Sequence, residues 1–149
     1  MTMTRREMCL LLPAAMLPAA AVVQVAEASE QDGSLPSAGY AFESLAVKTA
    51  ASGAQTRAIF KGKLATGESI ETHATTLPPG AVPHPPHHHV HSEMFFMREG
   101  TLELTVNGKT YPLGPGAVGF VRSNEEHGVK NVGTTPANYF VVAIGPSVG

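Results

Sequence analysis

Cysteine, tryptophan and charged residues are scarce in this sequence, and each shortage excludes a class of protein. Its 149 residues contain one cysteine, Cys9, and no tryptophan, so a disulfide framework is excluded. Charged residues make up 15% against 43% hydrophobic residues, which is typical of a folded domain and not of a disordered chain. The formal net charge is −2, without a run of lysine and arginine, so we expect no nucleic-acid partner. The length fits one domain.

The first 28 residues have the features of an export signal. Arg5 and Arg6 precede a weakly polar run over residues 8–26, and small residues before Ser29 favour cleavage there. Two prolines within the run argue against the alternative, a membrane anchor. The segment Thr4–Met8 resembles the twin-arginine signal, although the hydrophobic positions after its arginines differ. We expect a signal peptide over 1–28, using the twin-arginine or the general secretory route, and a periplasmic or secreted protein without a stable membrane anchor.

The rest of the chain has the pattern of an all-β domain. We expect a flexible arm over the polar residues 29–39 and a barrel domain over 40–146, where short runs rich in Val, Ile, Thr and aromatic residues alternate with Gly and Pro. Alternating leucine and valine, with the turn signal Asn107-Gly108, predict a hairpin over 101–112. Further strands are predicted over 57–60, 68–77, 93–97, 117–121, 127–131 and 138–144.

Five of the seven histidines are crowded into eight positions: His84, His87, His88, His89 and His91. One interpretation is a surface loop with adventitious metal affinity. The other is half of a metal site, because on a strand the first and third members of His87-His88-His89 point to the same side and the second points away. Glu93 has the same parity as this pair. It could reach the same point along one strand or from the start of the next strand, and His127 would supply a fourth ligand from a remote strand.

These residues carry a resemblance to the cupin family. The pattern His87-x-His89-x3-Glu93-x6-Gly100 resembles the first cupin motif, with the leading Gly offset by one position at residue 80. The pattern Gly116-x5-Arg-x-Asn-x2-His127-x3-Asn resembles the second motif. In the second motif, Arg and Asn stand at positions 122 and 124 where the family usually has Pro and Gly. The resemblance covers residues 40–146.

The resemblance implies a jelly-roll barrel, also called a double-stranded β-helix, that holds one divalent metal ion. The implied metal ligands are His87, His89, Glu93 and His127. Three imidazoles and a carboxylate suit Mn, Fe, Co, Ni, Cu or Zn and do not suit calcium. Such a set leaves coordination positions open for a substrate. Glu93 is in addition a candidate for proton transfer.

Taken together, the sequence predicts an exported, metal-dependent oxidoreductase, dioxygenase-like, acting on a small oxygen-rich molecule. The alternatives are a metal-dependent isomerase or lyase using the same ion, and a non-catalytic cupin that binds a small molecule. His91 shares the parity of the ligands, so it could orient them or carry a proton, but an exposed turn histidine is favoured. His73 is also expected at the surface, and Phe95 and Met97 in the barrel interior. Met94 and Phe96 face the other way, so we hypothesise that the arm or a second copy of the chain covers them, the latter as a homodimer.

Overall fold

The computed structural model describes residues 33–146, and nearly all of its regular structure is antiparallel β-sheet. A single turn of 3-10 helix, Phe42–Ser44, precedes the strands. The strands are β1 (Val47–Thr49), β2 (Gln55–Lys63), β3 (Ser69–Leu77), β4 (Ser92–Glu99), β5 (Leu102–Val106), β6 (Lys109–Leu113), β7 (Val118–Val121), β8 (His127–Asn131) and β9 (Ala137–Gly145). Each strand range predicted from the sequence overlaps one of these strands. The 3-10 turn and β1 were not predicted.

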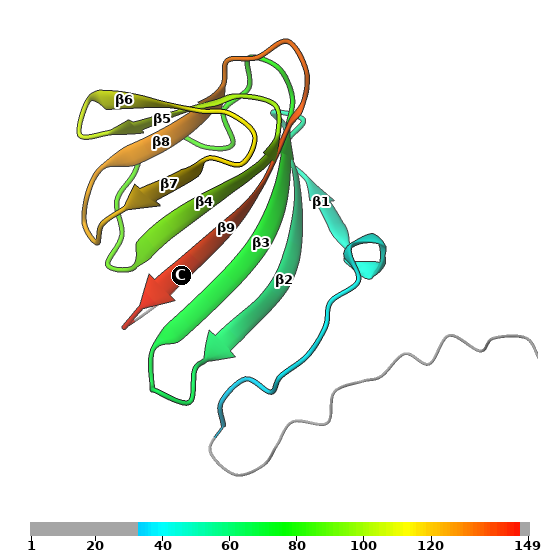
Figure 1. Cartoon of the computed structure of the whole chain (residues 1–149), viewed down its shortest axis with the longest axis vertical. Coiled ribbons are helices and arrows are strands. Elements are labelled where there is room, and N and C mark those ends of the chain that lie inside the picture. The colour runs from blue at the N-terminus through cyan, green and yellow to red at the C-terminus, as the bar shows by residue number, and fades with distance from the viewer. Residues whose placement is uncertain (1–32, 147–149) are drawn as a thin grey trace, which may run out of the picture.

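Two sheets form the barrel. The larger has the strand order β1-β2-β3-β9-β4-β7 and the smaller the order β6-β5-β8. Figure 1 shows the larger sheet curling, with the three short strands next to its β7 end. This arrangement confirms the predicted all-β jelly-roll barrel. It also brings β4 and β8, which carry Glu93 and His127, to facing sheets.

Alternation of side chains along the strands builds the core. In β5, Leu102, Leu104 and Val106 are buried whereas the residues between them are half-buried. The same alternation runs along β9, where every second residue from Ala137 to Ala143 is buried. As predicted, the β5–β6 hairpin turns at Asn107 and Gly108, both of which have positive φ. The core is therefore the space between the two sheets, and side chains of inward parity either fill it or line a cavity in it.

The structure explains why two residues of the motifs, Gly100 and Asn131, are needed at their positions. Gly100 has a φ of +77°, and a Cβ there would lie 2.7 Å from the Cα atom of Ala137. Only glycine avoids both the unfavourable backbone conformation and this contact. Asn131 is fully buried, and its amide group donates hydrogen bonds of 2.8 Å to the carbonyls of Leu77 and Thr135. Asn131 thus fixes the end of β8.

The N-terminal arm was predicted to be flexible over 29–39, and of this range the structure describes 33–39. These residues have no helix or strand, but the backbone N–H of Leu35 donates a hydrogen bond of 2.8 Å to the carbonyl of Lys63. The Leu35 side chain lies over Gly62, where a Cβ would approach it to 2.7 Å. Farther along, the ring of Tyr40 packs on Phe60 with centroids 5.5 Å apart. The segment therefore follows the outer face of β2.

The predicted signal peptide, residues 1–28, lies outside the described residues. Within residues 33–146, no helix is long and apolar enough to cross a membrane.

Candidate metal centre

A loop before β4 carries the histidine cluster. His87 forms an isolated antiparallel bridge with His127: the N–H of each residue donates to the carbonyl of the other, at 3.0 and 2.8 Å. His89 lies in the same loop, and Glu93 is the second residue of β4. Of the two routes left open by the sequence, the structure has the second, in which Glu93 comes from the start of the next strand. His88 is exposed, as its parity predicted.

Prolines limit the shape of this loop. Pro83, Pro85 and Pro86 precede the cluster, and each fixes its own φ. Pro86 also packs against Gly128 of β8, where a Cβ would lie 3.4 Å from the proline ring. The approach to His87 is therefore held both by the proline backbone and by contact with β8.

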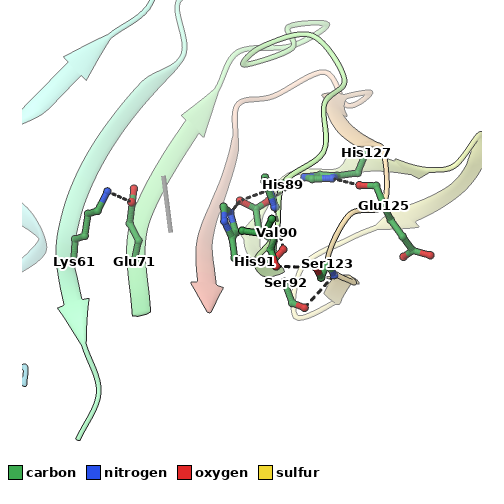
Figure 2. A network of polar contacts seen from close by, with 10 residues as sticks. Lys61, Glu71, His89, Val90, His91, Ser92, Ser123, Glu125 and His127 are labelled. Carbon is green, nitrogen blue, oxygen red and sulfur yellow. Dashed lines mark hydrogen bonds and ion pairs between the residues drawn. The ribbon is translucent and has the colours of Figure 1, made fainter. Parts of the chain in front are cut away.

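The turn before β8 holds the loop from the other side. The N–H of Asn124 donates to the carbonyl of His89 at 2.8 Å, and the Ser123 hydroxyl donates to the carbonyl of Val90 at 2.7 Å. The N–H of Ser123 also donates to the Ser92 hydroxyl at 3.2 Å (Figure 2). Asn124 has a φ of +62°, a conformation that asparagine tolerates better than most residues. The turn therefore forms although Asn stands where the family usually has Gly.

Backbone carbonyls orient two of the imidazole rings. Nδ1 of His89 lies 3.0 Å from the carbonyl oxygen of His91, and Nδ1 of His127 lies 2.9 Å from that of Glu125 (Figure 2). A carbonyl oxygen only accepts, so Nδ1 carries the proton in both rings. In a neutral ring the Nε2 lone pair is then free to bind a metal ion, an arrangement common in metal sites.

The Glu93 carboxylate lies among the rings. Its Oε2 atom is 3.1 Å from Nε2 of His127, and its Oε1 atom is 3.3 Å from Nε2 of His89. Burial raises the pKa of Glu93, but the hydrogen bond with His127 and the neighbouring imidazoles outweigh burial and lower this pKa to about 2. Glu93 is therefore a carboxylate at neutral pH.

His127 shows the complementary effect. It is 2% exposed, and this burial lowers its pKa, but the hydrogen bonds to Glu93 and to the Glu125 carbonyl outweigh burial and raise the pKa above its ordinary value. Both ring nitrogens face acceptors, so without a metal ion the ring must be protonated to satisfy them. A cation bound at Nε2 would replace that proton.

The donor set fits a transition metal. Among the described residues, Nδ1 of His87 and Nε2 of His89 are buried without a hydrogen-bond partner, and such orphaned atoms carry a cost that a metal ion would remove. Ligand atoms of His87, His89 and His127 lie within 4.8 Å of one another, as do those of His89, His91 and Glu93. The structure thus gathers all four predicted ligands into two overlapping groups. Their binding of a metal remains a prediction.

His91 was expected at the surface, and this prediction was wrong. It is 8% exposed, its ring stacks on that of His89 with centroids 3.5 Å apart, and its Nε2 atom lies 3.5 Å from Oε1 of Glu93. The His91 backbone passes close to strand β9, where the absence of a Cβ at Gly145 leaves room for it: a Cβ there would lie 2.9 Å from the His91 Cα. His91 is either an orienting neighbour of the ligands or a ligand itself.

His73 was also expected at the surface, and it faces the barrel interior instead. It lines a cavity of about 200 Å³ that reaches the His/Glu cluster at Glu93 and His127. The other lining residues are Ala50, Ala54, Thr56, Thr75, Pro83, His84, Phe95, Gly128, Val129, Tyr139 and Val141. Phe95 is buried there as predicted, and Met97 is buried in the adjoining core. The cluster therefore opens onto a space for a small molecule.

Glu125 contributes to the site through its backbone, which the sequence does not predict. Its carbonyl fixes the His127 ring. The signal was its position two residues before a ligand, but a backbone acceptor leaves no mark on residue type, so the pattern alone does not reveal it.

Comparisons with known proteins agree with the fold. The cupin domain described as Cupin_2 matches residues 73–143. A search of curated proteins found no match. Three similar solved structures are an RmlC-like cupin from Shewanella frigidimarina, with a TM-score of 0.61 and 20% identity over 74% of this chain and 93% of that one; a predicted oxalate decarboxylase from Thermotoga maritima, with a TM-score of 0.60 and 20% identity over 72% and 99%; and a sugar phosphate isomerase of the cupin superfamily from Silicibacter pomeroyi, with a TM-score of 0.59 and 18% identity over 71% and 74%.

At this level of identity, similarity to solved structures concerns the fold alone. The residues matched by the domain model include all four predicted ligands, His87, His89, Glu93 and His127. The chain therefore has the cupin fold, and a cupin domain model matches its residues 73–143.

Proposed function

We propose that the chain is a metal-dependent oxidoreductase of the dioxygenase type that acts on a small oxygen-rich molecule. The observation that carries this proposal is that the His/Glu cluster opens onto an internal cavity lined by hydroxyl groups. A metal that served only to stiffen the barrel would need no such space, because structural sites are closed whereas catalytic sites keep open positions.

The residues have distinct tasks in this proposal. His87, His89, Glu93 and His127 would hold the ion, which supplies Lewis-acid or redox chemistry when bound. The carbonyls of His91 and Glu125 keep the His89 and His127 rings in the tautomer that presents Nε2. Glu93 is the candidate proton-transfer group, because it is held ionised and lies within 3.5 Å of imidazoles that can exchange a proton.

The charge of the cavity narrows the substrate class. Within residues 33–146, its lining contains no lysine or arginine, the residues that usually bind phosphate groups. A neutral molecule or a single carboxylate is therefore favoured over a phosphate ester. For this reason we do not propose the activity in the name of the sugar phosphate isomerase for this chain. The decarboxylase name of another similar structure keeps lyase chemistry as an alternative outcome.

Metal analysis followed by activity assays tests the proposal. The purified mature protein is analysed for bound metals, and oxygen uptake and carbon dioxide release are then measured with phenols, diketones and small organic acids. We expect oxygen uptake that is lost in His89→Ala and kept in His88→Ala, whose ring is exposed. Carbon dioxide release without uptake would favour a lyase. Metal binding without turnover of any substrate would favour the non-catalytic binder.

We also propose that the protein is exported, and that two copies associate through the outer face of β4 and β7. The support for export is the sequence of residues 1–28 alone. Replacing Arg5 and Arg6 by lysine should leave the precursor in the cytoplasm if the twin-arginine route is used. Normal export of this variant would indicate the general secretory route.

A further inference from the structure

The internal cavity has a second polar region besides the His/Glu cluster. Thr56 of β2, His73 and Thr75 of β3, and Tyr139 of β9 all line it. The remaining lining of this region is apolar, from alanine, valine and phenylalanine side chains. A ligand that filled the cavity would therefore meet hydrogen-bonding groups at two places, the cluster and this group of four residues, which we call the far polar site.

Strand register places the far polar site beside the cluster on one inner face. His73 pairs with Val141 of β9, and Val141 pairs with Phe95 of β4. Glu93 is two residues before Phe95 and so has the same inward parity. With strands about 4.8 Å apart, His73 and the β4 backbone are separated by about 10 Å. Side chains that project inward from both strands shorten this gap to the length of a small molecule.

The His73 ring is left without a hydrogen-bond partner in the part of the chain that the structure describes. Among the described residues, its ring makes no hydrogen bond or ion pair, although it lines the cavity next to groups that could act as partners. Burial lowers the pKa of His73, and the coulombic effect of Glu71 and Glu93 does not reverse this. The ring is thus neutral at neutral pH and offers one N–H donor and one acceptor.

The other members of the far polar site are also uncharged. Burial raises the pKa of the Tyr139 phenol above its usual range, with the Thr75 hydroxyl beside it. Threonine hydroxyls do not ionise. The far polar site therefore suits a hydroxyl or carbonyl oxygen and disfavours a second carboxylate, whose charge would be buried without a partner.

We propose that His73, together with Thr56, Thr75 and Tyr139, binds the uncharged oxygen of a small hydroxy- or oxo-carboxylate. The carboxylate end of this molecule lies at the ion held by the His/Glu cluster. This rests on the proposed function. A divalent ion with one glutamate and neutral imidazoles leaves a net charge of +1, which one carboxylate balances. The cavity volume of about 200 Å³ corresponds to roughly seven waters. The ligand accordingly has roughly seven non-hydrogen atoms.

The experiment compares two probes that differ in one hydroxyl group. Zinc-loaded protein with isotopically labelled histidine rings is titrated with propionate and with 3-hydroxypropionate, and affinities are taken from ring-proton NMR shifts. We expect 3-hydroxypropionate to bind about fivefold more tightly than propionate, as one uncharged hydrogen bond would give. The His73 ring signals should move with the hydroxylated probe and stay in place with propionate.

Matched variants separate binding from folding. His73→Leu removes both nitrogens at similar volume, and His73→Asn keeps a donor and an acceptor. We expect the fivefold preference to vanish in His73→Leu and to be partly kept in His73→Asn, with zinc content and propionate affinity within twofold of the original protein in both. His88→Leu, at an exposed position of the loop, should leave the preference intact.

The outcomes distinguish this inference from the proposed function. A protein that binds zinc and propionate but shows no hydroxyl preference, or keeps the preference in His73→Leu, overturns the role of His73 alone. Tighter binding of malonate than of 3-hydroxypropionate that is lost in His73→Leu overturns the uncharged character of the far polar site. Failure to bind zinc overturns the proposed function, and the inference falls with it. Binding of zinc without binding of propionate overturns the placement of the carboxylate at the cluster and leaves the proposed function standing.

Discussion

At the residue scale, the hydrogen bonds of each imidazole separate the candidate ligands from their neighbours. His89 and His127 each donate from Nδ1 to a carbonyl and turn Nε2 toward Glu93. Burial lowers the pKa of His87, which favours the neutral form that binds metals. His88 has none of these features and is exposed.

This difference predicts the effects of single substitutions on metal binding. His87→Ala and His127→Ala should each lose most of the bound metal, because each removes a ligand atom, and His88→Ala should keep it. Metal content of the purified variants, measured by inductively coupled plasma mass spectrometry, checks this. The opposite ranking would contradict the ligand set.

In His91→Ala we expect about tenfold weaker metal binding, as for residues that orient ligands. A loss as large as in His87→Ala would identify His91 as a ligand.

The resemblance of the two motifs to the cupin motifs implied the four residues that lie together in the structure. The sequence could not predict the positions of His73 and His91. Both depend on which face of the strand or loop lies toward the barrel interior, and a lone histidine beside threonine and glutamate fits either face. In the structure, His73 pairs with Val141 and lines the cavity with it, and the His91 ring stacks on His89.

At the scale of elements, the pair Glu93–His127 joins β4 of the larger sheet to β8 of the smaller sheet. The pKa of Glu93 is lowered from 4.5 to about 2, so its contribution to stability is present above pH 4.5 and is lost toward pH 2. The pKa of His127 is raised above 6.5, so its contribution is present below pH 6.5 and is lost as the pH rises through the raised pKa. The pair therefore stabilises the metal-free protein most between pH 4.5 and 6.5.

Glu93→Gln should reveal this window in the metal-free protein. At pH 5.5 we expect a lower melting temperature, corresponding to about 2 kcal/mol for a hydrogen bond between charged groups, and a smaller difference at pH 3 and pH 9. Calorimetry after dialysis against a chelator measures it. The matched control is Glu71→Gln, because the ion pair of Glu71 with Lys61, at 3.3 Å, is largely exposed and should matter little at any pH. A difference independent of pH would contradict the assigned titrations.

The connection between β4 and β5 depends on Gly100. Gly100→Ala should lower the free energy of unfolding by about 2 kcal/mol or more, because it combines a positive φ with a Cβ 2.7 Å from the Ala137 backbone. Urea unfolding measures the change. Gly39→Ala is the control, since nothing lies within 4 Å of the added Cβ and φ is not positive, and its effect should be below about 0.5 kcal/mol. Equal effects would show that the close approach is relieved without cost.

Strands with a clear period-two pattern were predicted well. The residues 127–131 and the hairpin at Asn107-Gly108 appear where the sequence placed them. The prediction covered only part of β2 (Gln55–Lys63). The rest was missed because the strand contains exposed lysines and a register shift between Ala58 and Phe60, which break the period-two pattern. β1 has three exposed residues and is formed by pairing with β2, a tertiary cause that its own residues do not show.

At the scale of the whole molecule, the outer face of the larger sheet divides into a covered and an uncovered part. Leu35 and Tyr40 of this chain lie over β2. Phe96 of β4 pairs with Val118 of β7, and these residues and Phe120 are 39%, 55% and 58% exposed. An apolar surface of this kind is typical of a protein interface.

We therefore expect the mature protein to be a homodimer, with a mass in light scattering twice that of the chain. Phe120→Glu should convert it to a monomer without lowering its stability, because the side chain is exposed. Val132→Glu replaces an equally exposed apolar residue away from this face and should leave the dimer intact. A monomeric original protein, or a dimer unaffected by Phe120→Glu, would contradict the expectation.

The prolines before His87 have a consequence for how the centre exchanges its ion. A loop whose backbone is restricted by Pro83, Pro85 and Pro86, and pinned to β8 by the His87–His127 bridge, has little freedom left to lose on metal uptake. Uptake then requires loss of a proton from His127 and small ring movements, without folding of the loop. Apo and loaded crystals should accordingly superimpose over residues 83–91, and chelators should strip the ion without unfolding the barrel.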